Sequence, residues 1–369
     1  MIQQESKEHG SRFELKLHGI DTIQCAYYLQ GGDHMEAYID YALLARHKES
    51  IRQSKKKEPV PVILGNSEFL LHPYGSSSGY PIIISNSDFK IETGEFNMPN
   101  FFVTFTSEAL WRESAFLLHE KFLKWADSVG YKPMMNESLS RVDFCFDYKL
   151  PDVDFNEDCF VSYSKKDSQH REYGTVQTFT FGRDDIVLRV YDKIAEIRQQ
   201  SDKVWFFVLW GEESNVWRIE WQIRKPILKA ADIATFDELH ERQGDLLHYL
   251  AFDHDTLRQP NEDTNRSRWP LHRLWQDLQN RIDNLYSLSV HRVIGKEAIL
   301  NERMMQMAIS VYGYLKRVAA VSCIQKNAEQ MSLNDSVIRI VEIIQKIYDP
   351  LAWQMDVEKR RKEMILGKW

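Results

Sequence analysis

Three short segments in the middle of the chain carry polar or charged side chains at every second position. They span residues 141–148, 187–193 and 217–224. Side chains on a β-strand alternate between the two faces of a sheet, so each segment is predicted to be a strand with one polar face. The polar positions are Arg141, Asp143, Cys145, Asp147, Arg189, Tyr191, Lys193, Arg218, Glu220, Gln222 and Arg224.

These residue types suit metal-assisted chemistry on a phosphodiester. Asp143, Asp147 and Glu220 offer the hard oxygen ligands that Mg²⁺ or Mn²⁺ prefers, and such an ion polarises a scissile phosphate. Tyr191, on the same face, can displace the 3′-oxygen and remain as a 5′-phosphotyrosine. The cations that we expect to bind the phosphate or to favour the phenolate are Lys193, Arg189 and Arg218.

A simpler interpretation of the alternation needs no function. An antiparallel sheet with one packed and one solvated face produces the same pattern in any single strand. It does not predict the concentration of carboxylates, arginines, a tyrosine and a lysine on three strands. If these strands pair in one sheet, the metal ligands lie beside the residues that we expect to bind DNA, which are Arg141, Arg218, Gln222 and Arg224.

Two neighbouring residues have competing interpretations. Tyr148 is an alternative nucleophile, but the alternation places it on the apolar face, so we expect it in the core. Asp192 points away from Tyr191 in a regular strand. It can orient Lys193, or bind metal if a β-bulge turns it to the other face.

The elements that must position these residues alternate between strand and helix along the first part of the chain. Periodicity and turn residues predict strands over 69–105, 141–148, 175–181, 186–193, 204–209 and 216–224, and helices over 35–54, 108–129 and 236–252. A polar segment over 254–270 is predicted to be a linker, and only helical patterns follow it. We therefore predict an α+β catalytic domain over 12–255. A helical C-terminal region over 256–369 is expected to bind DNA or a partner.

The overall charge looks wrong for a protein that acts on DNA. The 47 Lys and Arg against 54 Asp and Glu give a net charge of −7. Net charge governs solubility and long-range steering, whereas phosphate binding depends on local placement, so a locally basic sheet face is still expected.

The four cysteines show no metal-ligand spacing. The longest apolar run, 205–210, is far short of the roughly 20 residues that cross a bilayer. With a polar N-terminus that lacks a secretory signal, we expect a cytoplasmic protein without membrane contact.

The order of these motifs resembles that of the Rep_trans family. Its members are rolling-circle replication initiators of plasmids and filamentous phages, with relatives that act as relaxases of mobilisable elements. The resemblance covers residues 12 to about 250 and is sharpest over 140–225. Its most specific part is the turn at Gly182 followed by Arg189-x-Tyr191-Asp192-Lys193 and then by Arg218-x-Glu220-x-x-x-Arg224.

The resemblance implies a site-specific DNA nickase and strand transferase whose catalytic tyrosine falls on Tyr191. Asp143 and Glu220 match the acidic residues that hold a divalent cation, and Asp147 is a further candidate. The family also implies a saddle-like sheet, as in TATA-box-binding protein, with helices packed on one face. It implies a homodimer, an origin of replication or transfer as DNA target, and a host helicase recruited in trans. The chain has no P-loop motif of a fused helicase. The competing hypothesis is a non-catalytic DNA-binding regulator or scaffold on the same fold.

Overall fold

The computed structural model describes residues 13–31, 39–172, 175–285 and 296–365. The chain divides into two compact units. The first is made of Met1–Asp202 and Glu212–Val293, and the second of Lys203–Gly211 and Ile294–Trp369.

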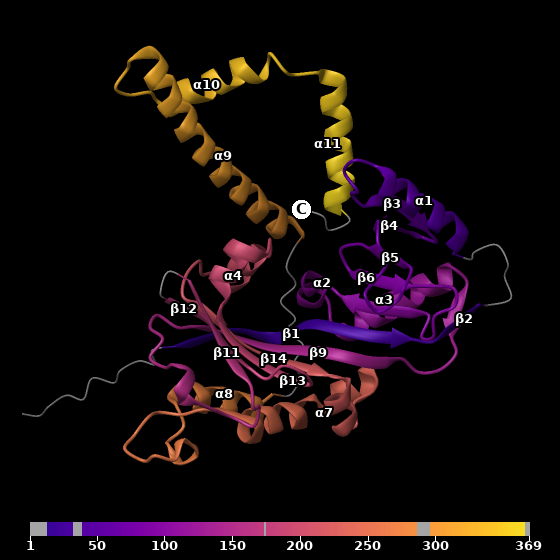
Figure 1. Cartoon of the computed structure of the whole chain (residues 1–369), viewed down its shortest axis with the longest axis vertical. Helices are drawn as coiled ribbons and strands as arrows, with labels where there is room; N and C mark the ends of the chain where they lie inside the picture. Colours follow the sequence, from indigo (N-terminus) through magenta and orange to yellow (C-terminus); the bar gives the residue numbers. More distant parts are fainter. Residues whose placement is uncertain (1–12, 32–38, 173–174, 286–295, 366–369) are drawn as a thin grey trace, which may run out of the picture. The chain divides into compact units, whose positions relative to one another are not determined.

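The first unit is built on an antiparallel sheet of eleven strands among the described residues (Figure 1). The strands follow one another across the sheet in the order β11-β12-β13-β14-β9-β1-β7-β6-β5-β4-β3. In chain order these strands are β1 (Glu14–Tyr27), β3 (Val60–Leu64), β4 (Ser67–Leu71), β5 (Ile82–Ser85), β6 (Phe89–Thr93), β7 (Phe101–Phe105), β9 (Ser138–Lys149), β11 (Asp167–Glu172), β12 (Thr175–Phe181), β13 (Ile186–Asp192) and β14 (Val216–Arg224). The shorter strands β2 (Leu29–Gly31) and β8 (Tyr131–Pro133) pair with each other, as do β10 (Phe160–Ser162) and β15 (Asp255–Leu257).

Helices occupy the connections of this unit. They are α1 (Tyr41–Gln53), α2 (Ser107–Arg112), α3 (Ala115–Ser128), α4 (Lys193–Gln200), α6 (Lys225–Ala230), α7 (Phe236–His248), which runs into a π-helical turn over Tyr249–His254, and α8 (Arg273–Asp283). In Figure 1, α7 and α8 lie on one side of β9, β13 and β14, and α4 lies on the other. The α+β architecture predicted from the sequence is therefore present, with a large antiparallel sheet at its centre.

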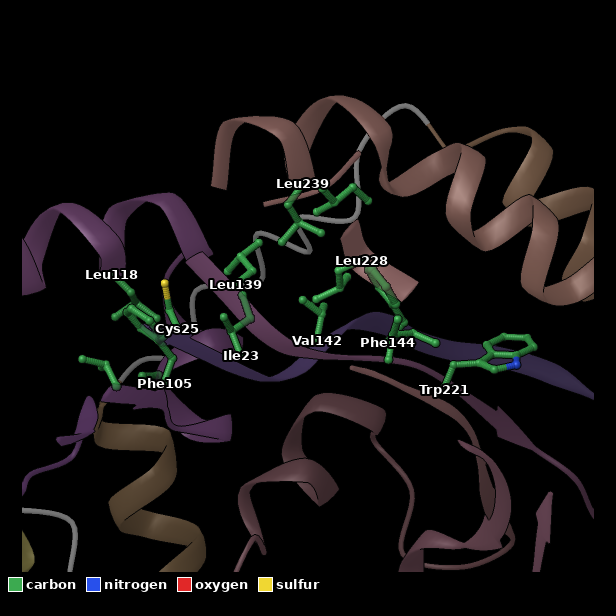
Figure 2. Close-up of a cluster of buried hydrophobic side chains, with 14 of the residues drawn as sticks. Ile23, Cys25, Phe105, Leu118, Leu139, Val142, Phe144, Trp221, Leu228 and Leu239 are labelled. Atoms are coloured by element: carbon green, nitrogen blue, oxygen red, sulfur yellow. The ribbon is translucent and has the colours of Figure 1, made fainter. Parts of the chain in front are cut away.

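The hydrophobic core lies between the apolar face of the sheet and the helices on that side. Val142 and Phe144 of β9 are fully buried and point toward Leu228 of α6, with Leu239 of α7 nearby (Figure 2). The alternate residues of the same strand point to the opposite face, where the polar positions lie. Tyr148 is buried in this core, as expected, and its hydroxyl donates to Asp277 Oδ2 at 2.9 Å.

The single helix expected over 108–129 is two helices. Ser114 is extended between them and its side-chain oxygen accepts a hydrogen bond from the backbone N–H of Leu117, so it is the N-cap of α3. A serine at this place satisfies one of the orphan donors of a new helix start. The apolar residues at this junction do not face the core, because Phe116 is 48% and Leu117 is 52% exposed.

The strand expected over 204–209 is instead helix α5 (Trp205–Trp210), which belongs to the second unit. A short apolar run cannot be assigned to strand or helix by periodicity. The following Gly211 adopts a φ of 64°, the left-handed conformation that ends helices, and its N–H donates to the carbonyl of Phe207.

The polar linker expected over 254–270 begins with the buried strand β15. Asp255 is 1% exposed and accepts a hydrogen bond from the indole N–H of Trp221 at 2.9 Å. Because α8 follows within the same unit and packs on α7, the compact unit extends beyond the expected boundary at residue 255.

The second unit also contains three long helices, in agreement with the helical C-terminal region predicted from the sequence. They are α9 (Lys296–Lys326), α10 (Leu333–Ile344) and α11 (Pro350–Ile365). Helix α10 packs against α9. Within the described ranges, no helix combines the length and apolar character that a membrane span requires.

Candidate active site on the central sheet

The strand register brings the three polar segments together on one face of the sheet. Strand β14 lies between β13 and β9, and all three are antiparallel. Tyr191 is directly opposite Arg218, which in turn is opposite Asp147. Directly opposed residues share a face, so the three strands pair in one sheet and their polar positions lie on one face of it.

Tyr191 is held by a carboxylate of the neighbouring strand. Its hydroxyl donates to Glu220 Oε2 at 2.8 Å. Burial raises the pKa of Tyr191 well above its ordinary value, and the negative charge of Glu220 raises it further, while Arg218 opposes both. The hydroxyl is therefore protonated at neutral pH in this arrangement, and Glu220 is the acceptor in place to take its proton.

Arg189 binds the other oxygen of the same carboxylate. Its Nη2 donates to Glu220 Oε1 at 2.6 Å and lies 3.4 Å from Gln222 Oε1. Its Nε is buried and has no hydrogen-bond partner in the part of the chain that the structure describes. A buried donor of this kind is costly unless it meets an acceptor, and a phosphate oxygen is a suitable one.

Asp143 is paired with an arginine two residues away on its own strand. Arg141 Nε donates to Asp143 Oδ1 at 2.8 Å. Burial raises the pKa of Asp143 to about 6, the hydrogen bond from Arg141 lowers it in part, and the charge of Glu220 raises it again. Asp143 and Glu220 are thus two buried carboxylates that lie close enough for the charge of Glu220 to raise the pKa of Asp143.

The raised pKa of Asp143 predicts a pH-dependent stability in the absence of metal. The folded state holds the proton of Asp143 up to a pH of about 6, whereas the ordinary value is 3.8. The contribution of Asp143 to the free energy of unfolding is therefore fully present below pH 3.8, and this contribution is lost as the pH rises through about 6. The loss is on the order of 3 kcal/mol. Urea denaturation in EDTA should show Asp143→Asn gaining stability relative to the wild type between pH 4 and 7. Parallel profiles for the two proteins would contradict this expectation.

Asp147 has a different role from the one expected. Its two oxygens accept from Arg218, with Nε to Oδ1 at 2.6 Å and Nη2 to Oδ2 at 2.8 Å. Both side chains are fully buried. Asp143 also binds a guanidinium through both oxygens, but its partner Arg141 is partly exposed, whereas Arg218 is fully buried and cannot turn away to solvent. We therefore leave Asp147 out of the metal site proposed below.

Asp21 is a member of this cluster that the sequence analysis missed. Its Oδ1 accepts from Arg218 Nη1 at 2.8 Å, and also from Ser107 and from the indole of Trp111 on α2. The register of β1 against β9 shifts between Ile20 and Thr22, so Asp21 lies at a β-bulge. Asp21 breaks the alternation of its strand, because Ile20 and Ile23 on either side of Asp21 and Thr22 are apolar, but the bulge that places it on the polar face is not visible in the periodicity.

Lys193 and Asp192 belong to the start of α4. Asp192 is the N-cap, and its Oδ1 accepts from the backbone N–H of Ala195 at 3.0 Å. Lys193 is the first helical residue and is buried, with its Nζ 2.5 Å from Glu196 Oε2 and 5.6 Å from the centre of the Tyr191 ring. The lysine thus lies near the tyrosine, although it is not on the strand.

The residues present fit a divalent cation in part. In the described ranges, no group of three or more His, Cys, Asp or Glu could hold a metal ion by itself. Mg²⁺, however, is commonly bound by one or two carboxylates with water and substrate phosphate completing the shell. Asp143 and Glu220 supply two such carboxylates, and Asp143 lies directly opposite Gln222 in the register. The charge of Glu220 raises the pKa of Asp143, and a bound cation would offset the repulsion between the two carboxylates.

Comparisons with known proteins found a distant structural likeness. No family model matches the chain. A search of curated proteins found no match either. A search of solved structures found similarity to a rolling circle replication initiator protein from Geobacillus stearothermophilus, with 19% identity and a TM-score of 0.42, covering 74% of this chain and 98% of that chain. At this identity and score, the function has to be argued from the chain's own residues.

Proposed function

We propose that this protein cuts one strand of DNA by attack of Tyr191 on a phosphodiester at a specific site. The reaction leaves a 5′-phosphotyrosine on the protein and a free 3′-hydroxyl on the DNA. The observation that carries this proposal is the hydrogen bond of 2.8 Å from the Tyr191 hydroxyl to the buried carboxylate of Glu220. It places a nucleophile and a proton acceptor in contact, which is the arrangement that activates a hydroxyl.

The surrounding cations support the same reaction. Glu220 accepts the proton as the tyrosine oxygen approaches phosphorus, and the departing 3′-oxygen takes a proton from water to become the 3′-hydroxyl. Arg189 presents a buried N–H without a partner among the described residues, and this donor suits a phosphate oxygen. Arg218 lies opposite Tyr191 and its positive charge favours the phenolate. Arg141, Gln222 and Arg224, at the same end of the strands, are proposed to bind the DNA backbone.

A divalent cation is part of the proposal. Asp143 and Glu220 would hold Mg²⁺ or Mn²⁺. The ion would neutralise charge on the scissile phosphate. Arg141 and Arg189, which pair with these carboxylates in the structure, would then have donors available for the substrate.

The remaining expectations from the sequence stay predictions. They are a saddle-shaped sheet, an origin of replication or transfer as target, a homodimer, a host helicase in trans and a cytoplasmic location. The apolar face of α10 gives self-association a physical basis, because Leu333, Val337, Ile338, Val341 and Ile344 are all at least 39% exposed.

A covalent-adduct assay tests the proposed function directly. The full-length protein is incubated with single-stranded oligonucleotides that cover the DNA neighbouring its gene, in Mg²⁺ or Mn²⁺. We expect oligonucleotide labelled at its 3′ end to migrate with the protein on a denaturing gel. The 5′-labelled fragment should be released with a free 3′-hydroxyl.

Metal removal should abolish both products, because the ion that would neutralise charge on the scissile phosphate is then missing, while Arg141 and Arg189 stay paired with Asp143 and Glu220. An adduct that forms equally in EDTA would exclude the metal from the mechanism. DNA binding without any adduct in Mg²⁺ or Mn²⁺ would favour the non-catalytic regulator or scaffold.

A further inference from the structure

A line of hydrogen-bond donors crosses the sheet beside the candidate active site. In the strand register, Arg224 of β14 faces Arg141 of β9, and Arg141 faces Gln24 of β1. Their neighbours on β14 and β9, Gln222 and Asp143, belong to the site itself. The line therefore passes through Arg141, two residues along β9 from Asp143, the proposed metal ligand.

The same line continues across the other half of the sheet. Gln24 faces Thr104 of β7, Thr104 faces Lys90 of β6, and Lys90 faces Ser85 of β5. The intervening residues of these strands, such as Val103 and Ile91, are fully buried on the opposite face. Arg224, Arg141, Gln24, Thr104, Lys90 and Ser85 thus share the polar face, and we call them the donor row.

The donor row is accessible and free of acidic members. Arg224 is exposed, Lys90 is 45% exposed at its side chain, and the other four are partly exposed. Lys90 Nζ is 2.9 Å from Glu92 Oε1, and Arg141 pairs with Asp143. An ammonium has three donors and a guanidinium has five, so one such pairing leaves further donors for a ligand.

We propose that single-stranded DNA leaving Tyr191 runs along the donor row, across β9, β1, β7 and β6. The inference rests on the proposed function and adds the path of the substrate. Strands are spaced at about 4.8 Å, so six strands span roughly 24 Å, the length of about seven stacked nucleotides. Lysine and arginine contact phosphates, and the neutral donors bind phosphate or sugar oxygens between them.

Binding of a 20-nucleotide oligothymidylate to the full-length protein, followed by fluorescence anisotropy over a range of KCl concentrations, tests the row. Lys90→Gln removes one phosphate contact, so affinity should fall about threefold at low salt and the slope of log affinity against log salt should decrease by about 0.7. Gln24→Ala should lower affinity without changing the slope, because no charge is lost. Thermal melts establish that each variant is folded.

Lys124→Gln is the matched control. Lys124 lies on α3, away from the polar face, and its side chain is 78% exposed. We expect this variant to bind like the wild type. If Lys90→Gln behaves as Lys124→Gln does, with unchanged affinity and slope, the donor row is not the DNA path. A wild-type protein that gives no covalent adduct would instead overturn the nicking function, so the two failures are distinguishable.

Discussion

Replacing Tyr191 with phenylalanine is expected to abolish the covalent adduct and the nicking of supercoiled target DNA, while DNA binding is retained. The substitution removes the oxygen that attacks phosphorus and keeps the ring that packs beside Lys193. No other group in the proposed mechanism can form the phosphotyrosine bond, so activity should fall to the background of the assay. The measurement is the denaturing gel with 3′-labelled oligonucleotide, together with conversion of supercoiled to open-circular DNA.

Tyr148→Phe is a closely matched control for this variant. Tyr148 also donates to a carboxylate, that of Asp277, at the same kind of distance, but it lies on the core face of the sheet. Loss of its hydroxyl should cost about 1 kcal/mol of stability and leave adduct formation intact. Adduct formation by Tyr191→Phe at the wild-type rate would show that another residue is the nucleophile.

Replacing Arg218 with methionine is expected to give the largest loss of stability. Arg218 is fully buried and bridges two carboxylates, Asp147 and Asp21. Methionine fills much of the same volume but leaves both acids buried without their cation. Removing one member of a buried ion cluster costs about 3–5 kcal/mol. Urea denaturation at pH 7 measures this cost as a decrease in the free energy of unfolding.

Two further variants identify the cause of that loss. Arg224→Met removes an exposed arginine from the same strand and should change stability by no more than about 0.5 kcal/mol. Adding Asp21→Asn and Asp147→Asn to Arg218→Met should recover part of the stability, because the uncompensated charges are then gone. If the free energy of unfolding of the single Arg218→Met variant lay within about 1 kcal/mol of the wild-type value, water would have to reach the two acids readily.

The polar sheet face was predictable because strand periodicity is a local property. Side chains two residues apart lie on the same face whatever the rest of the chain does. Asp143, Glu220 and Tyr191 therefore came to one surface as soon as their strands paired, and Tyr148 went to the core. The helical C-terminal region was predictable for the same reason.

Other features depended on contacts that periodicity does not contain. Lys193 left the strand because Asp192 caps a helix, so the face expected for it does not exist. The apolar run at 204–209 became a helix that ends at Gly211. In both places local patterns allowed two structures, and the surrounding fold selected one of them.

The sequence by itself determined which residues share the polar face, because alternation along one strand is enough to assign it. Only the tertiary structure decided what each carboxylate does. Asp147 and Asp143 are equivalent in the pattern, yet Asp147 pairs with the fully buried Arg218, whereas Asp143 pairs with the partly exposed Arg141. Arg218 and Asp21 are 197 residues apart, and a β-bulge brings the acid to the arginine. Burial and charge pairing arise between distant strands, so the difference between the two acids appears only when those strands are assembled.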